Sequence, residues 1–138
     1  MTKQMPAFVY GTLREGFGNY SRLLEGKVKS NTPATLEGFE MFSVGGFPAI
    51  LPADGVIVGE LIEIDEDQYT NTLHDLDILE GYYPGKESHS MYLRKTMTVT
   101  TEDGEKVEAY VYIWNRPAPR IKVTSGDWKQ YVKGLAAY

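Results

Sequence analysis

Residues 91–114 read MYLRKTMTVTTEDGEKVEAYVYIW and carry the strongest strand signal in the chain. β-Branched and aromatic residues dominate residues 91–101 and 106–114, as is typical of strands. Between these two runs lies Asp103-Gly104, a pair that readily adopts the positive backbone angles of a hairpin turn. We therefore predict two antiparallel strands joined by this turn.

Weaker strand signals precede this hairpin. Residues 7–10 form a short apolar run, and residues 34–44 mix aromatic and aliphatic residues with polar ones. Residues 56–64 are apolar at 56, 58 and 61, with a change of phase near Gly59. A glycine at such a change of phase indicates either a β-bulge or the close approach of another backbone segment.

One segment has a clear helical period. Asp65 is a suitable N-cap with Gln68 three residues later, and one helical face then carries Tyr69, Leu73, Leu76 and Glu80. Shorter helical turns are expected at residues 19–25 and 127–133. These elements predict an α+β fold in which a curled, mixed sheet packs against the long helix and can close into a barrel.

Length and composition indicate the number of domains and exclude several kinds of functional site. The 138 residues suit one hydrophobic core, so we expect residues 1–138 to form a single domain. The chain has no cysteine, which excludes disulfides, thiolate zinc sites and cysteine nucleophiles. His74 and His89 are far apart and lack metal-ligand spacing, so neither a metal site nor a cofactor is expected.

Charge and hydropathy narrow the partners and the location. The net charge is −5 and the basic residues are scattered, so we expect no nucleic-acid partner. No apolar run approaches the length of a signal peptide or a membrane span, so we expect a cytoplasmic protein that does not bind membranes. The sequence does not indicate an oligomeric state.

Glu80 is the first candidate for chemistry. It follows Leu73 and Leu76 at spacings of three and four, which puts a carboxyl where a core residue is expected. Burial disfavours the charged form and raises the pKa toward neutrality, as general acid-base catalysis requires. The alternative is that Glu80 is the solvent-facing last residue of its helix, with Gly81 as the C-cap.

The second candidate is the sequence Tyr10-Gly11-Thr12-Leu13, where an apolar strand meets a glycine. Successive backbone N–H groups in such a turn can form a concavity that binds a carboxylate or a phosphate. The alternative is an ordinary turn followed by Arg14 on the surface. A charged pair at Asp75 and Asp77 is interpreted as solvated.

Taken together, six short motifs resemble the γ-glutamylcyclotransferase-like (AIG2-like) family. In chain order they are Tyr10-Gly11-Thr12-Leu13-Arg14, Phe47-Pro48, Val58-x-Glu60-Leu61, Leu76-Asp77-x-Leu79-Glu80-Gly81, Tyr92-x-Arg94 and Ala109-x-Val111-Tyr112. They extend from about residue 7 to residue 114, which is most of the chain.

The resemblance implies a small mixed β-barrel with a few surrounding helices and a cavity at one end, and Glu80 as the catalytic acid and base. It also implies cyclisation of a small γ-glutamyl amine or amino-acid derivative to 5-oxoproline, with release of the amine. Tyr10, Gly11, Thr12 and Leu13 would bind the substrate, and Tyr92 and Tyr112 are candidates for the cavity wall. Tyr92 and Arg94 share one face of a strand, so an ordinary place in the barrel interior would also explain them.

Two other functions remain open at this stage. A non-catalytic module on the same fold could bind a small anion or a nucleotide-like ligand, because fold does not fix function. Alternatively, the same site could form or cleave an amide in a specialised metabolite. A carboxyl pointing into the cavity argues against an anion binder, since like charges repel there.

Overall fold

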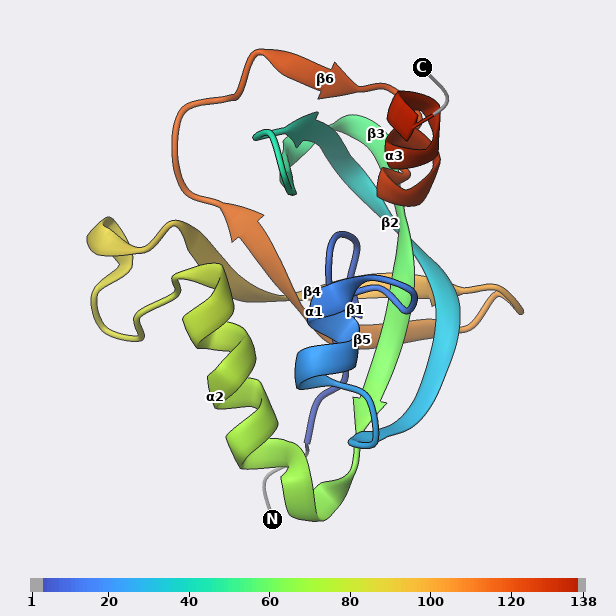
Figure 1. Ribbon diagram of the computed structural model, residues 1–138, viewed down its shortest axis with the longest axis vertical. Coiled ribbons are helices and arrows are strands. Elements are labelled where there is room, and N and C mark those ends of the chain that lie inside the picture. Colours follow the sequence, from blue (N-terminus) through green and yellow to red (C-terminus); the bar gives the residue numbers. More distant parts are fainter. Residues whose placement is uncertain (1–3, 137–138) are drawn as a thin grey trace.

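Two long strands, β2 (Val28–Ser43) and β3 (Pro48–Ile64), frame the computed structural model, which describes residues 4–136 (Figure 1). They pair antiparallel along almost their whole length, with a register shift between Glu37 and Phe39. Such an irregularity bends a strand pair and increases its twist. β3 contains the predicted segment 56–64, and β2 contains the predicted segment 34–44 except Val44; both strands begin well before the predicted start.

The other strands close this pair into a barrel. The strand order is β3-β1-β5-β4-β2, and β2 pairs back to β3. The strands that complete the ring are β1 (Ala7–Val9), β4 (Tyr92–Thr101) and β5 (Lys106–Trp114). β1 is antiparallel to β3 and parallel to β5, so the barrel is mixed, and the predicted α+β barrel with surrounding helices is confirmed.

The predicted hairpin is β4 and β5. The two strands pair in continuous register from Tyr92 opposite Trp114 to Thr100 opposite Lys106. Gly104 lies in the turn with a φ of 89°, a conformation that glycine adopts without steric cost. A further short strand, β6 (Ile121–Val123), was not predicted and extends the sheet along the end of β2.

Three α-helices lie outside the barrel in residues 4–136. They are α1 (Gly18–Leu23), α2 (Tyr69–Glu80) and α3 (Trp128–Ala136), and α2 lies along the barrel wall (Figure 1). Two 3₁₀ turns are also present, η1 (Glu66–Gln68) and η2 (Glu87–His89). Among the described residues, none of the helices is both long and apolar enough to cross a membrane.

The expected N-cap of the long helix was wrong in detail. The side chain of Asp65 makes no capping hydrogen bond, and its backbone carbonyl instead accepts from Gln68 N–H at 3.0 Å. That bond forms the 3₁₀ turn η1, and α2 begins only at Tyr69. Short i to i+3 turns of this kind are common at helix starts.

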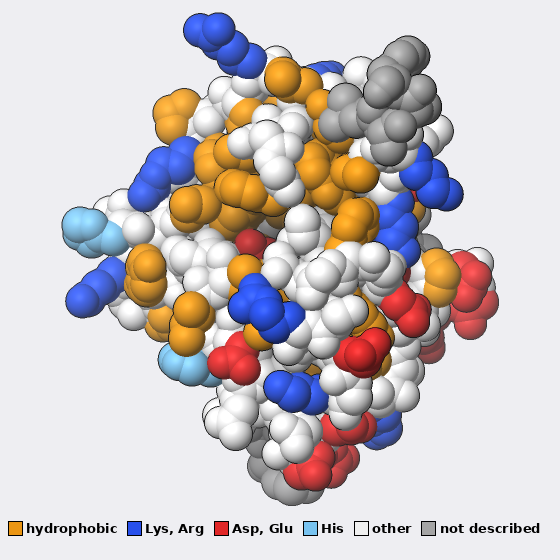
Figure 2. Space-filling view, viewed as in Figure 1, with side chains coloured by type: hydrophobic (Ala, Val, Ile, Leu, Met, Phe, Trp, Pro, Cys, Tyr) orange, Lys and Arg blue, Asp and Glu red, His pale blue; other side chains and the backbone are white. Residues whose placement is uncertain are grey.

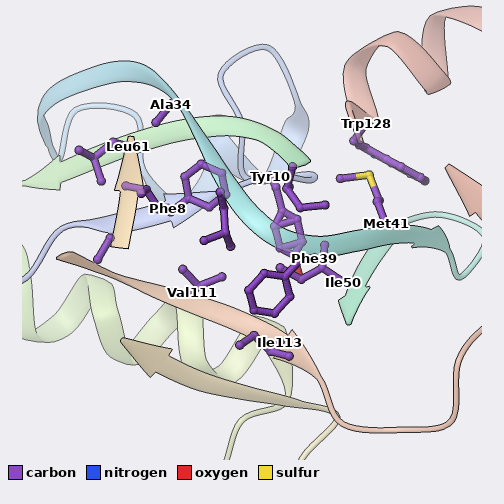
Figure 3. Packing of buried hydrophobic residues seen from close by; sticks show 14 of the residues in the cluster. Phe8, Tyr10, Ala34, Phe39, Met41, Ile50, Leu61, Val111, Ile113 and Trp128 are labelled. Atoms are coloured by element: carbon purple, nitrogen blue, oxygen red, sulfur yellow. The ribbon is translucent and has the colours of Figure 1, made fainter. Parts of the chain in front are cut away.

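Strand alternation builds two cores from one sheet. In β1, Phe8 belongs to the cluster inside the barrel, whereas Ala7 and Val9 belong to a cluster beneath the helices. Figure 3 shows Phe8, Tyr10 and Val111 among the side chains of the inner cluster. The outer cluster contains Leu76 of α2, which packs α2 against the outside of the barrel wall.

Gly59 marks a close approach between strands. A Cβ at this position would meet the Val9 carbonyl oxygen at 2.5 Å and the Phe8 ring at 2.7 Å. Gly59 pairs regularly with Ala34, and the β2–β3 register shifts occur elsewhere. Of the two alternatives predicted for this change of phase, close backbone approach is therefore correct.

We expect Gly59→Ala to lower the free energy of unfolding by about 2 kcal/mol or more, because the added methyl group overpacks the contact with β1. Urea unfolding followed by circular dichroism measures this change. Gly46→Ala is the matched control, since a Cβ there meets nothing within 4 Å. An equal change in both variants would contradict the packing explanation.

Candidate active site

All seven residues predicted to form the site line one pocket. The pocket lies where β1 ends, β3 and β4 begin and α2 ends. Its full lining is Phe8, Val9, Tyr10, Gly11, Thr12, Leu13, Phe47, Pro48, Glu80, Tyr92 and Tyr112. The space-filling view shows apolar side chains gathered on the same face of the molecule (Figure 2).

Glu80 is the last residue of α2 and the one acidic residue in the pocket lining. Gly81 follows with a φ of 65° and caps the helix, as the alternative prediction held. The side chain of Glu80 nevertheless lies in the pocket wall and is only partly exposed. Burial raises its pKa from 4.5 to about 7.

Among the described residues, none donates a hydrogen bond to the Glu80 carboxyl, and none forms an ion pair with it. A hydrogen-bond donor or a cation beside the carboxylate would have stabilised its charged form and lowered the pKa. The raised pKa therefore has a single cause, the loss of water around the carboxyl.

Three tyrosines form much of the pocket wall, and each hydroxyl proton is already used by the protein. Tyr10 donates to the Tyr112 carbonyl at 2.6 Å, and Tyr92 donates to the Pro48 carbonyl at 2.6 Å. Tyr112 donates to Asp77 Oδ1 at 2.7 Å. Burial raises the pKa of all three phenols, so they remain neutral and shape the pocket.

The turn after β1 presents backbone donors. Among the described residues, none accepts a hydrogen bond from the N–H groups of Gly11, Thr12 or Leu13. Gly11 packs against the ring of Pro48, and a Cβ at Gly11 would lie 2.6 Å from that ring. Glycine is therefore required for the turn to lie against the start of β3, and unpaired amides of this kind can bind an anion.

Asp77 is buried, which contradicts the prediction that it is solvated. Besides the Tyr112 hydroxyl, it accepts from Arg94 at 2.7 Å. Arg94 also lies over the ring of Tyr110. Tyr92, on the same face of the strand as Arg94, belongs to the outer cluster. These side chains face α2, so the barrel-interior explanation was wrong.

Arg14 is also buried and is not the surface residue that the alternative prediction supposed. Its Nε donates to Glu60 at 3.0 Å, and its guanidinium donates to Asp127 at 2.8 Å. Lys129 lies 3.2 Å from the same Glu60 oxygen that Arg14 contacts. Because Arg14 follows Leu13 directly, this network holds the turn of the pocket.

Glu60 receives several hydrogen bonds that anchor the turn. Its second oxygen accepts from Glu15 N–H at 2.9 Å and from Asn31 Nδ2 at 3.1 Å. Burial alone would raise the Glu60 pKa, but the backbone amide and the side chains of Asn31, Arg14 and Lys129 together lower it. Sequence reasoning quoted Glu60 within a motif but gave it no role, because its partners are distant along the chain.

The pocket can support proton transfer next to an anionic group. It combines a carboxyl that titrates near neutral pH, three free backbone amides and neutral aromatic walls. A carboxyl with this pKa can accept and return a proton at physiological pH. Among residues 4–136, no group of three or more His, Asp or Glu side chains is placed to hold a metal ion.

Comparisons with known proteins show which family the chain is similar to. The family model described as gamma-glutamyl cyclotransferase, AIG2-like, matches residues 7–130. A protein of Methanocaldococcus jannaschii, named as a candidate gamma-glutamylcyclotransferase, is 33% identical over 126 residues, which are 90% of this chain and 95% of that protein.

Two further proteins extend the comparison. The gamma-L-glutamyl-butirosin B gamma-glutamyl cyclotransferase of Niallia circulans is 31% identical over 124 residues, which are 90% of this chain and 75% of that protein. The crystal structure of an AIG2-like protein from Mus musculus superimposes with a TM-score of 0.60 at 27% identity, covering 86% of this chain and 82% of that one.

The Arg14 network supports a stability prediction. We expect Arg14→Met to lower the free energy of unfolding by about 3 kcal/mol, because it removes the cation that bridges the buried Glu60 and Asp127 and leaves Glu60 paired only with Lys129 among the described residues. Lys122→Met is the control, since its ion pair with Glu40 is exposed and should contribute less than about 1 kcal/mol. Urea unfolding compares the two, and equal losses would contradict the role of burial.

The raised pKa of Glu80 predicts a pH-dependent difference in stability. The folded state holds the Glu80 proton more tightly than the unfolded state, so the wild type loses stability as the pH rises from 4.5 to about 7. Glu80→Gln lacks this loss. After allowance for partial exposure, we expect the variant to gain about 2 kcal/mol over the wild type above pH 7.

Urea unfolding of both proteins at pH 4, 6 and 8 measures this difference. The advantage of Glu80→Gln should be small at pH 4, grow through pH 6 and level off at pH 8. Glu66→Gln, which changes an exposed carboxyl just before α2, is the control and should show no such trend. A constant difference across the pH range would contradict the buried carboxyl.

Proposed function

The chain belongs to the γ-glutamyl cyclotransferase, AIG2-like family, and we propose that it cyclises the γ-glutamyl part of a small γ-glutamyl amine or amino-acid derivative to 5-oxoproline. The observation that carries this proposal is the Glu80 carboxyl, which lies in the pocket with a pKa of about 7. The products are 5-oxoproline and the free amine.

The reaction is intramolecular. The α-amine nitrogen of the substrate attacks its own γ-amide carbonyl carbon, and a new C–N bond closes the five-membered ring. The bond from that carbon to the departing amine nitrogen then breaks. Because both reacting groups belong to one molecule, the enzyme mainly has to hold them in the right conformation.

Glu80 moves the proton in both halves of this reaction. The carboxylate first takes a proton from the α-ammonium group, which frees the nitrogen lone pair for attack. The resulting carboxylic acid then gives that proton to the departing amine nitrogen. The attacking nitrogen loses its second proton to solvent as the lactam forms, and the released amine takes up a proton from solvent, so the two transfers balance. A pKa of about 7 suits both directions, because the carboxyl is neither too weak a base nor too weak an acid.

The turn after β1 would hold the substrate. The free N–H groups of Gly11, Thr12 and Leu13 are suited to the substrate α-carboxylate. Arg14 is already paired with Glu60 and Asp127, so its charge is not available for this purpose. Tyr92 and Tyr112 would form the walls beside the reacting atoms, with their hydroxyl oxygens still able to accept hydrogen bonds.

The name of the Niallia circulans relative refers to γ-L-glutamyl-butirosin B, in which a γ-glutamyl group is attached to butirosin B. We extend to this chain only the γ-glutamyl group, because the pocket residues discussed above address that part of a substrate. The departing amine would lie toward the open mouth of the pocket.

The test is release of 5-oxoproline from a panel of γ-glutamyl amines, γ-glutamyl amino acids and γ-glutamyl-ε-lysine. We expect release by the wild type and a fall in kcat of at least about 10²-fold in Glu80→Gln, since the amide cannot transfer the proton. Mass spectrometry of the products measures the reaction. Below about pH 7, wild-type kcat/KM should fall as Glu80 becomes protonated.

Glu66→Gln is the control and should retain wild-type turnover, because its carboxyl is exposed and lies outside the pocket lining. Equal turnover by Glu80→Gln and the wild type would contradict the proposed role of Glu80 in proton transfer. Binding of γ-glutamyl compounds without 5-oxoproline release would instead favour a non-catalytic ligand-binding module on this fold.

A further inference from the structure

Asn19 of α1 contacts the pocket through the side chain of Thr12. Asn19 Nδ2 donates a hydrogen bond to Thr12 Oγ1 at 2.8 Å. Thr12 is partly buried and lines the pocket, whereas Asn19 does not line it. Asn19 therefore contacts a residue of the pocket lining from outside the pocket.

The direction of this hydrogen bond is fixed by Arg22, one helical turn further along α1. The guanidinium of Arg22 donates to Asn19 Oδ1 at 2.8 Å. A guanidinium can only donate, so the oxygen of the Asn19 amide must face Arg22. The amide nitrogen then faces Thr12, and Thr12 Oγ1 must accept.

A threonine hydroxyl that accepts from Asn19 still has its own proton to donate. Among the described residues, none accepts a hydrogen bond from Thr12 Oγ1. The three side chains thus form a chain of donors that runs from Arg22 through Asn19 and ends with the O–H group of Thr12, which is a residue of the pocket lining.

We propose that Asn19 is a positioning residue that fixes the Thr12 hydroxyl as a hydrogen-bond donor to the carboxylate of the bound ligand. This inference rests on the proposed function, because the ligand is taken to be the α-carboxylate of a γ-glutamyl compound. The hydroxyl adds one oriented donor to the backbone amides of Gly11 to Leu13. Hydrogen bonds to a charged acceptor are stronger than those between neutral groups.

Substitutions at Asn19 separate this role from simple packing. Asn19→Asp keeps the shape, but a carboxylate can only accept, so the Thr12 proton turns toward it and away from the ligand. Asn19→Ala leaves the hydroxyl free to rotate and still able to donate. We therefore expect affinity for the carboxylate ligand to fall about tenfold or more in Asn19→Asp and only about threefold in Asn19→Ala.

Two controls separate the hydroxyl from the added charge. Ser21→Asp places a negative charge on the same helix at an exposed position, away from Thr12, and should leave affinity nearly unchanged. Thr12→Val removes the hydroxyl at similar volume and should lower the affinity for the carboxylate ligand about tenfold. Thr12→Ser keeps a hydroxyl and should retain most of the affinity. In Thr12→Val, the further change Asn19→Asp should have little effect, because its target hydroxyl is gone.

The measurement is a titration of each ¹⁵N-labelled full-length protein with 5-oxoproline, followed at the amide signals of Gly11, Thr12 and Leu13. KM and kcat for the most active γ-glutamyl compound provide the second measurement. The substitutions at Asn19 should raise KM and leave kcat nearly unchanged, since ground state and transition state lose the same contact.

The outcomes distinguish this inference from the proposed function. The inference would be overturned if the protein turns over its substrate and Asn19→Asp binds 5-oxoproline as tightly as the wild type. Equal losses of affinity in Asn19→Asp and Ser21→Asp would also overturn it. Either result would leave the proposed cyclisation in place. If the wild type shows no turnover but the variants rank as predicted in their affinity for 5-oxoproline, the inference is supported and the proposed reaction is rejected. Wild-type protein whose turn signals do not respond to 5-oxoproline would overturn the inference.

Discussion

The three buried residues of β1 close the barrel, and this closure positions the turn after β1 that lines the pocket. β1 pairs with β3 on one side and with β5 on the other, so Ala7–Val9 complete the ring. The chain leaves this strand at Tyr10 and turns at once, which places the free amides at one end of the barrel. α2 packs on the outer wall and ends beside the same opening, which brings Glu80 to those amides although they are distant in sequence.

The surroundings of two glutamates, Glu60 and Glu80, shift their pKa values in opposite directions. Glu60 is buried among a guanidinium, an ammonium group, an amide side chain and a backbone N–H, and these donors keep its pKa low. Glu80 is desolvated with no such partner, and its pKa rises to about 7. The first residue holds structure and the second can exchange protons at neutral pH, a division of roles that follows from environment alone.

Local sequence patterns predicted those structural features whose physical causes act between residues close together in the sequence. The hairpin was readable from Asp103-Gly104, and the place of Glu80 followed from its spacing to Leu76, because turn chemistry and helical period act over a few residues. Pairings across the chain were not readable. Nothing near Arg14 or Asp77 reveals that Asp127 and Arg94 will neutralise them, so a surface position for Arg14 stayed open as an alternative and Asp77 was predicted to be solvated. The alternation that sends Tyr92 toward α2 likewise depends on which face the helix covers.

The network behind the turn has a consequence for how this sequence can change. Arg14, Glu60, Asp127 and Lys129 carry two positive and two negative charges, so their sum is zero. Replacing any one of them unbalances the charge around the buried pair Arg14 and Glu60, which is costly, whereas exchanging a whole pair for apolar residues is far less so. The four positions should therefore co-vary in evolution and resist single-site randomisation, even though more than a hundred residues separate the first from the last. A library that diversifies the C-terminal helix alone would thus lose variants through a contact at the opposite end of the chain.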